Sequence, residues 1–441
     1  MSIDAAHPPT RPLPRPLDST LPADPAGRGD RAAGSPAPQG IQAASRAEPD
    51  LDALLRLVLC GGPLTARRSL LVRFGCASAA LAAGAGAWRD AGFGMDQISR
   101  LRIPDTPELR RAREWLRGTG HHLLGWQDPD YPPLLRRAPN APLALFVAGD
   151  PSLLWRPAIA IVGSRQPTPG GRDNAAAFAR AFARAGLVVS SGMAAGIDTA
   201  AHLATLEADG PTVAVLGTGP DVAYPPGNGG LLRRIAEAGV VVTEHPPGTG
   251  PRKEHFPSRN RILAALTTGT VVVEAAARSG ALITARLAAE AGREVFALPG
   301  SVHNPMARGC HRLIRDGATL VETPQDVLDG LASQLANLAA ELQSALGDQS
   351  GEACVRSRPS PARAQVSQAV VRPVQRGAGP GITPDDPDSH LLWNALGHDP
   401  TDMDQLVART GLTAADLSSM LLLMELEGRV TAQHGRYHRN G

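Results

Sequence analysis

A regular alternation of short apolar runs and amphipathic segments between residues 158 and 321 constrains the fold more than any other feature. The apolar runs lack a polar residue at every second position, which is typical of parallel strands buried on both faces. We expect strands at 158–163, 187–190, 212–216, 240–243, 270–273, 294–298 and 319–321, and helices at 172–185, 197–207, 231–238, 258–266, 282–291 and 310–315. The pattern predicts an α/β fold, a Rossmann-like doubly wound parallel sheet.

Composition changes on both sides of this domain, for which we expect the bounds 128–330. Residues 1–49 contain ten prolines and no hydrophobic periodicity, which predicts a disordered, proline-rich tail. Residues 331–386 begin with one amphipathic segment and continue as a stretch rich in Ser, Pro, Arg and Gly, which predicts a linker. Residues 387–441 hold three helical segments and a short hairpin, and we expect a winged-helix domain there.

Residues 50–127 are helical in pattern, with Leu51, Leu54 and Val58 at helical spacing before the break CGGPL at 60–64. Two helices joined by a glycine turn resemble a helix-hairpin-helix or SAM-like unit. Such hairpins can offer backbone N–H groups to DNA phosphates. A small helical bundle without a ligand is an equally good interpretation.

Composition also limits the environment and the partners of the chain. The formal net charge is only +2, so a nucleic-acid surface must be a local patch. The four cysteines are far apart and form no CxxC pair, which favours free thiols in a reducing compartment over a zinc or redox site. The N-terminus has no apolar core of a signal peptide, and no apolar run approaches the length of a membrane span. We expect a cytoplasmic protein.

Several glycine-containing loops follow the expected strands, at the sheet edge where open parallel sheets bind ligands. They read GSRQ at 163–166, SGMAAGID at 191–198, GTG at 217–219 with YPPGN at 224–228, and SGA at 279–281. Backbone N–H groups of such turns face anions. The dinucleotide fingerprint GxGxxG is absent after the first strand and a Walker lysine motif is absent as well, so no nucleotide cofactor is indicated.

The segment PRKEHFPSRNRIL at 251–263 follows the fourth strand and carries the strongest binding signal. Lys253 is the single lysine among 44 basic residues, and Phe256, Arg259 and Arg261 follow it closely. Cations next to an aromatic ring can hold a phosphate backbone and stack a base. A solvated basic face is the ordinary alternative.

Acidic groups at this edge give no convincing catalytic set. Asp198 and His202 share a helix face, but a capping or surface pair is a more common arrangement than a metal site. Glu244 and Glu274 both follow strands, and we expect them to orient Arg259, Arg261 or other cations. We therefore predict neither a metal, nor a cofactor, nor catalysis.

The loops coincide with the motifs of a known family. The runs IVGSR at 161–165, SGMAAGID at 191–198, VLGTG at 215–219, YPPGN at 224–228, FPSRNRI at 256–262, VVVEA at 271–275, SGALITA at 279–285, GREVFALPG at 292–300 and LIRDGA at 313–318 resemble the DNA-processing protein DprA, also called Smf. The helical unit and the winged helix also match the architecture of many bacterial members. The loop that holds Cys310 and His311 departs from the usual pattern, which has small polar residues there.

This resemblance implies a protein that binds single-stranded DNA, protects incoming DNA in natural transformation and loads the RecA recombinase onto it, with single-strand-binding protein as a further partner. It also implies a homodimer. The residues that match the family's DNA pocket are Ser164, Arg165, Ser191, Gly192, Gly217, Lys253, Phe256, Arg259 and Asn260. Arg261 joins them as part of the basic segment, or else it pairs with Glu244 or Glu274. Leu313, Ile314 and Leu320 are the expected dimer interface.

Two other functions stay open. A related group of Rossmann-like enzymes hydrolyses nucleoside monophosphates, but the loop that carries its PGGxGT motif reads EAAARSG at 274–280 here. A transcription regulator would rely on the winged helix. The third helix of that domain is rich in Leu and Met and carries Glu425 and Glu427, which argues against a helix that reads the major groove.

Overall fold

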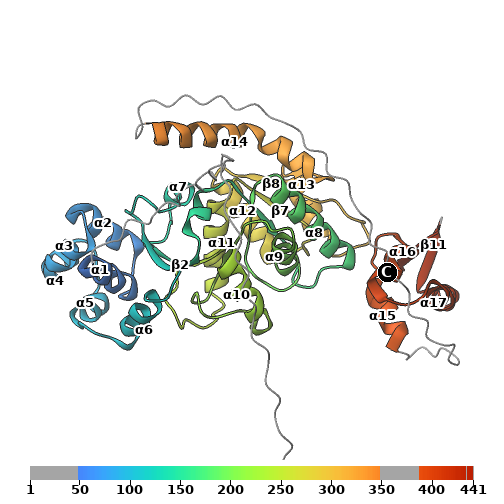
Figure 1. The fold of residues 1–441 in the computed structure, drawn as a ribbon, viewed down its shortest axis with the longest axis horizontal. Helices are drawn as coiled ribbons and strands as arrows, with labels where there is room; N and C mark the ends of the chain where they lie inside the picture. The colour runs from blue at the N-terminus through green and yellow to red at the C-terminus, as the bar shows by residue number, and fades with distance from the viewer. Residues whose placement is uncertain (1–47, 348–386, 434, 441) are drawn as a thin grey trace, which may run out of the picture. The chain divides into compact units, whose positions relative to one another are not determined.

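The computed structural model describes residues 48–347, 387–433 and 435–440 (Figure 1). Nearly all of the predicted tail at 1–49 lies outside these residues, because only Glu48 and Pro49 are described, and they begin helix α1. Most of the predicted linker at 331–386 also lies outside them. Its first part belongs to α14 (Pro324–Gly347), which confirms one helix there and shows that it begins earlier than expected.

A nine-stranded sheet forms the centre of the fold, in the order β1-β2-β6-β5-β4-β3-β7-β8-β9. The strands are β1 (His121–Gly125), β2 (Ala144–Gly149), β3 (Ala158–Val162), β4 (Val188–Ser191), β5 (Thr212–Val215), β6 (Val240–Thr243), β7 (Gly269–Val272), β8 (Glu294–Ala297) and β9 (Thr319–Leu320). From β6 to β9 all neighbours are parallel. The doubly wound parallel sheet is therefore confirmed, with β1 and β2 added as an antiparallel extension.

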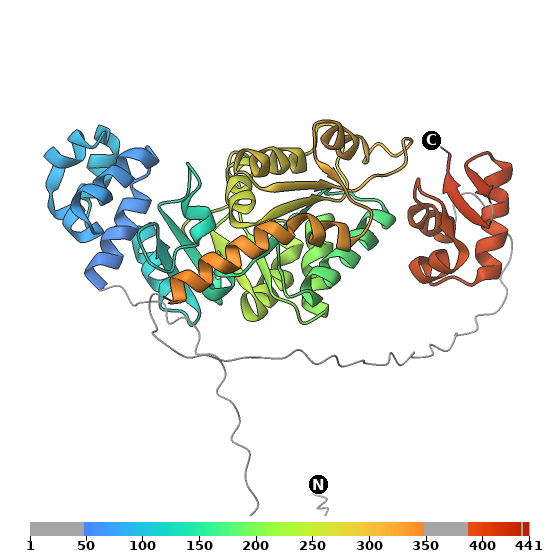
Figure 2. The ribbon, with the colours of Figure 1, turned by 90° about the horizontal axis from the view of Figure 1, so that it is seen from above.

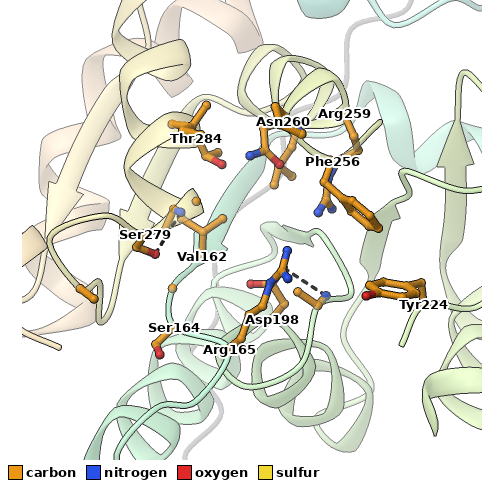
Figure 3. A pocket seen from close by; sticks show the side chains of 18 of the residues that line it. Val162, Ser164, Arg165, Asp198, Tyr224, Phe256, Arg259, Asn260, Ser279 and Thr284 are labelled. Carbon is orange, nitrogen blue, oxygen red and sulfur yellow. Dashed lines mark hydrogen bonds between the residues drawn. The ribbon is translucent and has the colours of Figure 1, made fainter. Parts of the chain in front are cut away.

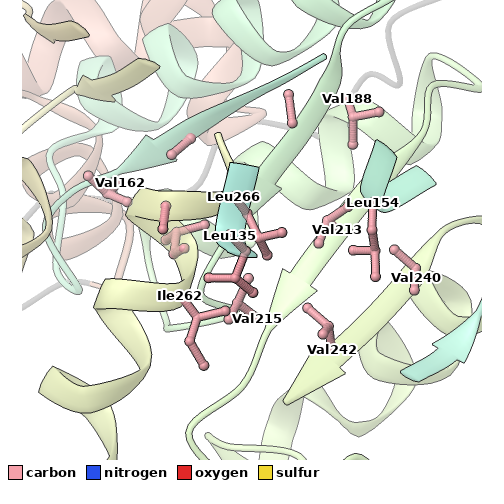
Figure 4. Close-up of a cluster of buried hydrophobic side chains, with 14 of the residues drawn as sticks. Leu135, Leu154, Val162, Val188, Val213, Val215, Val240, Val242, Ile262 and Leu266 are labelled. Carbon is pink, nitrogen blue, oxygen red and sulfur yellow. The ribbon is translucent and has the colours of Figure 1, made fainter. Parts of the chain in front are cut away.

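Helices cover both faces of the sheet (Figures 1 and 2). They are α7 (Pro133–Arg136), α8 (Pro169–Arg184), α9 (Ile197–Glu207), α10 (Gly229–Ala238), α11 (His255–Leu266), α12 (Gly280–Glu290) and α13 (Arg308–Arg315), with the 3₁₀ turns η1 (Pro151–Trp155) and η2 (Pro226–Asn228). Alternate residues of each strand point to opposite faces. In β3, Ala160 packs with the side of α11 and α12, whereas Ile159 and Ile161 pack with α8 and α9. Figure 4 shows the first of these clusters, in which Ile262 of α11 lies beside Val215 of β5.

The order of the strands places a switch point between β3 and β7. From β3 the chain moves outward through β4, β5 and β6, and then it crosses back to pair β7 with the other side of β3. Loops after β3 and β7 therefore diverge to opposite faces and leave a crevice at the carboxyl ends of the strands, where doubly wound folds bind ligands.

The described residues before the sheet, from Glu48 on, form six helices: α1 (Glu48–Leu59), α2 (Leu64–Phe74), α3 (Ala77–Ala82), α4 (Gly84–Asp90), α5 (Met95–Arg102) and α6 (Pro107–Leu116). Their common core includes Leu54, Leu70 and Trp88 and extends to Phe146 of β2. The turn between α1 and α2 has positive φ values of 70° at Gly61 and 81° at Gly62, a conformation that glycine adopts readily. The predicted glycine turn between two helices is therefore present.

After the undescribed segment, α15 (Pro387–Ala395), α16 (Met403–Thr410) and α17 (Ala414–Leu426) pack around a small core, and β10 (Thr401–Asp402), β11 (Val430–Gln433) and β12 (Arg436–Arg439) form a second sheet. This arrangement confirms the winged helix. Thr413 caps α17 by accepting a hydrogen bond from the Asp416 N–H. Asp402 caps α16 by accepting a hydrogen bond from the Gln405 N–H, and Thr401 before it lies in the two-residue strand β10.

Within the described ranges, no single helix is long and apolar enough to cross a membrane; only the bent pair α16 and α17, at 108° to each other, passes on combined length and composition.

Candidate nucleic-acid interface

A cavity of about 620 Å³ opens at the switch point, beyond the carboxyl ends of the parallel strands (Figure 3). Its walls come from the loops after β3, β4 and β5 and from the first turns of α11 and α12. The predicted residues that line it are Ser164, Arg165, Lys253, Phe256, Arg259 and Asn260. Gly192 lines a smaller adjoining hollow of about 160 Å³. The cavity thus brings together predicted residues that lie up to 96 positions apart, from Ser164 to Asn260.

The loop after β3 supplies one buried hydroxyl and one exposed cation. Ser164 Oγ accepts a hydrogen bond from the Gln166 N–H at 3.1 Å, which shapes the turn. Arg165 is exposed, and its guanidinium carbon lies 5.9 Å from the centre of the Phe256 ring. At that distance the cation lies at the limit of a cation–π contact, and its N–H groups are free to bind an anion.

Two aromatic rings, those of Tyr224 and Phe256, line the cavity together with the loop after β3. The centres of the Tyr224 and Phe256 rings are 5.0 Å apart and the rings are inclined by 43° (Figure 3). Gly217 lies behind Phe256, since a Cβ atom at position 217 would stand 3.2 Å from Phe256 Cδ1. Gly217 therefore allows the ring to pack closely, although it does not itself line the cavity. The exposed Lys253 completes this wall.

Arg259 is a buried cation below the cavity, with only 5% of its surface exposed. Its Nη1 donates a hydrogen bond of 2.5 Å to the carbonyl of Val215 at the end of β5. Burial lowers the pKa of this guanidinium, and the carboxylate of Asp198 opposes that shift. Among the residues that the structure describes, Arg259 Nε has no hydrogen-bond partner. The Arg259 side chain therefore connects α11 to β5, and its Nε–H group can still donate a hydrogen bond next to the cavity.

The loop after β4 is held from below by Asp198. Its Oδ2 accepts hydrogen bonds from the N–H groups of Gly192, at 3.1 Å, and Ala194, at 3.3 Å. Burial raises the pKa of this carboxyl, and Arg259 and the N–H donors counteract the rise. Met193 has a φ of 56°, a left-handed conformation that non-glycine residues seldom adopt outside functional loops. The hydroxyl of Ser191 turns away from the cavity and donates to the Ile161 carbonyl at 2.7 Å.

Arg261 lies outside both hollows and forms an ion pair. Its Nη2 is 2.5 Å from Glu244 Oε2, and both side chains are largely buried, with 23% and 19% exposed. Ser258 Oγ donates to the other oxygen of Glu244 at 3.1 Å. Of the two roles considered for Arg261, the structure therefore favours the pair with Glu244.

The prediction that Glu274 orients an arginine is wrong. Its carboxylate accepts hydrogen bonds from the Thr168 N–H at 2.9 Å, the Thr168 hydroxyl at 2.6 Å and Asn304 Nδ2 at 3.2 Å. The loop after β3 passes close to β7, so Glu274 meets the first residues of α8 before it can reach a cation. The carboxylate fixes the start of α8 beside the cavity.

The pair Asp198 and His202 does not converge on one point. Whereas Asp198 holds the loop after β4, His202 Nδ1 lies 2.7 Å from Thr212 Oγ1. The Thr212 hydroxyl donates its proton to the Val189 carbonyl, so the His202 N–H donates to Thr212. Complete burial lowers the pKa of His202 to about 3 and keeps the ring neutral. In the described part of the chain, no group of three potential metal ligands exists.

Leu313 and Ile314 on α13 are half-buried, and Leu320 on β9 is 47% exposed at the edge of the sheet. The three residues remain the predicted dimer interface. Cys310 is fully buried against β7. Burial raises the pKa of its thiol to about 12, so this residue is a core side chain and not a reactive thiol.

Tyr224, Ser279 and Thr284 line the cavity as well, although they are not among the predicted site residues. Ser279 caps α12 by accepting a hydrogen bond from the Ala281 N–H at 3.3 Å. All three lie in the motifs YPPGN and SGALITA. A systematic inclusion of every polar or aromatic residue in the loops after the strands could have found them.

Comparisons with known proteins agree with this architecture. The family model described as DNA recombination-mediator protein A matches residues 122–332, and the DprA winged helix domain matches residues 377–436. Protein Smf of Escherichia coli is 36% identical over 349 residues, which cover 79% of this chain and 85% of that protein. Protein Smf of Synechocystis is 37% identical over 321 residues, 71% of this chain and 78% of that protein.

The X-ray structure of DNA processing protein A from Streptococcus pneumoniae has a TM-score of 0.57 and 37% sequence identity to this chain, and the match covers 63% of this chain and 97% of that one. Sequence, domain order and fold therefore agree. The chain belongs to the DprA family of DNA recombination-mediator proteins, which also bears the name Smf.

Proposed function

We propose that this protein binds single-stranded DNA in the cavity at the switch point. The observation that carries the proposal is the arrangement of Arg165 and Lys253 around the Phe256 ring within one cavity. Single strands are held without sequence preference where cations follow the backbone and aromatic rings stack the bases. A duplex keeps its bases stacked on one another and cannot place one against Phe256.

Within the cavity the residues have different roles. Arg165 and Lys253 bind phosphates, and Phe256 stacks a base with Tyr224 as its neighbour. Asn260 and Ser164 offer hydrogen bonds to sugar or base edges. Gly192 and Gly217 give space for Arg259 and Phe256, whereas Ser191 and Arg261 act through the framework of the loops.

The role of the bound strand follows from the family. We propose that the protein acts in the cytoplasm as a homodimer, protects incoming DNA during natural transformation and loads RecA onto it. Single-strand-binding protein is a further partner in this proposal, because loading requires its displacement. The surface around Leu313, Ile314 and Leu320 is the proposed contact between the two copies.

No catalytic step is needed for this role. The two carboxylates nearest the cavity already accept hydrogen bonds: Asp198 from Gly192 and Ala194, and Glu274 from Thr168 and Asn304. This engagement supports a binding protein over a nucleoside monophosphate hydrolase.

A titration of single-stranded and duplex oligonucleotides across a range of salt concentrations tests the proposal. Binding of the single strand should weaken steeply as salt rises, because phosphate contacts release counterions. Equal or tighter binding of the duplex would contradict it. Release of free base from nucleoside monophosphates would restore the hydrolase alternative, and failure of RecA to displace single-strand-binding protein in the presence of this protein would contradict the loading role.

A further inference from the structure

A second hollow of about 410 Å³ adjoins the cavity along α12. We call it the α12–α13 groove, because residues of these two helices and of the turn before α12 form its walls. Ser279 and Ile283 line both hollows. The groove and the cavity therefore meet at these two residues on one face of α12.

The charge of the groove suits a polyanion. Arg278, Arg286 and Arg312 line it against a single carboxylate, that of Asp316. Arg278 is exposed and forms no ion pair within the described ranges. The net charge of the whole chain is only +2, so three cations around one hollow make a local concentration of positive charge.

Two of these arginines have acidic neighbours, but the pairs are weak. Arg286 Nε lies 3.4 Å from Glu290 Oε1, and Arg312 Nε lies 3.4 Å from Asp316 Oδ2. All four side chains are more than half exposed. Pairs of this kind are screened by salt and are worth little, so either guanidinium can turn to a phosphate.

Apolar side chains lie between the charges. Ile283, at the boundary of the two hollows, is 36% exposed, and Leu282 contributes to the groove. Leu313, part of the proposed contact between two copies, lines the α13 side, so the groove runs beside that contact. Because a single strand presents sugars and base faces as well as phosphates, a surface that alternates cations with apolar contacts fits it better than a uniform basic face.

We propose that single-stranded DNA leaves the cavity over Ile283 and continues along the α12–α13 groove, where Arg278, Arg286 and Arg312 bind consecutive phosphates. This inference rests on the proposed function of the cavity. The groove then lengthens the segment of DNA that one subunit occupies, and short strands that fill only the cavity do not reach it.

The test compares two oligothymidines, of about 5 and about 20 nucleotides, within and beyond the usual range of single-strand site sizes. Their binding to the full chain is measured by fluorescence anisotropy at several salt concentrations. The variant Arg278→Gln/Arg286→Gln/Arg312→Gln should lower the salt slope for the long strand by about 2, at about 0.7 for each lost phosphate contact, and weaken its binding about tenfold or more. Binding of the short strand should stay unchanged.

The variant Arg184→Gln/Arg233→Gln/Arg234→Gln is the matched control. It removes three exposed arginines from α8 and α10, on the other face of the sheet, and should bind both strands like the parent. Since all six replaced side chains are exposed, both variants should keep the parent's thermal unfolding midpoint.

The outcomes separate this inference from the proposed function. If the parent binds neither strand, the proposed function fails. If the parent binds both and the groove variant binds the long strand with an unchanged slope, the DNA path through the groove is wrong. A groove variant with unchanged DNA binding but an altered mass in light scattering would instead assign the groove to the contact between two copies of the chain.

Discussion

The guanidinium of Arg259 fills the space beside Gly192 that any larger residue would need. A Cβ atom at position 192 would stand 1.8 Å from Arg259 Nη1, and the same Nη1 donates a hydrogen bond to Val215. Gly192 also donates its N–H to Asp198. One close approach therefore fixes α11, the end of β5 and the loop after β4 relative to each other, directly below the cavity.

We expect Gly192→Ala to displace Arg259 and to weaken both the fold and the site. Forcing an extra methyl group into a tightly packed position costs about 1–3 kcal/mol in the free energy of unfolding. Binding of single-stranded DNA should fall as well, because Phe256 stands on the same helix as Arg259. Urea unfolding and a DNA titration measure the two effects.

Gly230→Ala in α10 is the matched control for this change. A Cβ atom at position 230 would meet nothing within 4 Å, and the position lies in a helix, so its stability should be unchanged or slightly higher. If Gly192→Ala behaved like Gly230→Ala in both measurements, the close packing of Arg259 against Gly192 would be wrong.

Lys253 and Arg261 should differ sharply although both are cations of the same segment. Lys253→Ala removes one phosphate contact, which should lower the slope of log K against log salt for a single strand by about 0.7 and weaken binding to all sequences alike. Arg261→Ala should leave the slope unchanged and lower the free energy of unfolding by about 1.5–3 kcal/mol, because it leaves the Glu244 carboxylate without its charged donor.

Salt titrations of DNA binding and urea unfolding curves of both variants show which of the two cations contacts a phosphate and which stabilises the fold. The double variant Arg261→Ala/Glu244→Gln serves as a control, because the uncharged amide no longer needs the guanidinium and part of the lost stability should return. A reduced salt slope for Arg261→Ala would place this residue on the DNA.

Phe256 should contribute through its π face. We expect Phe256→Ala to weaken binding of single-stranded DNA by about 1–3 kcal/mol, the usual contribution of one stacked base. Phe256→Leu, which keeps an apolar side chain but removes the ring, should lose most of that energy, whereas Phe256→Tyr should retain it. Fluorescence quenching by an oligothymidine gives the affinities, and equal affinity of the Leu variant and the parent would show that no base stacks there.

Much of the fold could be predicted because each parallel strand is a continuous apolar run between helical segments. The expected ranges for α9 and β6 agree with the structure at both ends. β1 was missed, since its sequence HHLLG begins with two histidines and is too short for a clear strand pattern. Its partner β2 lies 19 residues further along, from Gly125 to Ala144, so the pairing has no local signal.

The site was predictable in position but not in the roles of single residues. The loops after the strands had to meet at one edge, which is a property of every parallel sheet. Arg259 and Arg261, two positions apart on a helix, point to nearly opposite sides. Which of them faces the cavity depends on how α11 packs against β5. The sequence of the basic segment alone does not determine that packing. Tyr224 meets Phe256 only because the loop after β5 folds back against α11.

The ring of His245, in the loop after β6, stacks on His255 at the start of α11, and this pair predicts a loss of stability in acid. The rings of His245 and His255 are 3.9 Å apart and inclined by 19°. Burial, followed by the nearby His255, lowers the pKa of His245 to about 4, while Glu244 acts in the opposite direction and Arg261 and Arg252 add to the decrease. In the unfolded chain this histidine titrates near its ordinary value of about 6.5.

Below pH 6.5, His245 therefore binds a proton in the unfolded chain, whereas in the folded chain it stays neutral down to about pH 4. The free energy of unfolding should fall as the pH drops through this window. His202, with a pKa of about 3, acts in the same direction.

We expect His245→Gln to lose less stability than the parent between pH 6.5 and 5, by about 1 kcal/mol. Urea unfolding followed by circular dichroism at pH 8, 6.5 and 5 measures the difference. His390→Gln, on the exposed side of α15, should follow the parent. Parallel pH curves for His245→Gln and the parent would show that His245 is protonated as easily in the folded protein as in the unfolded chain.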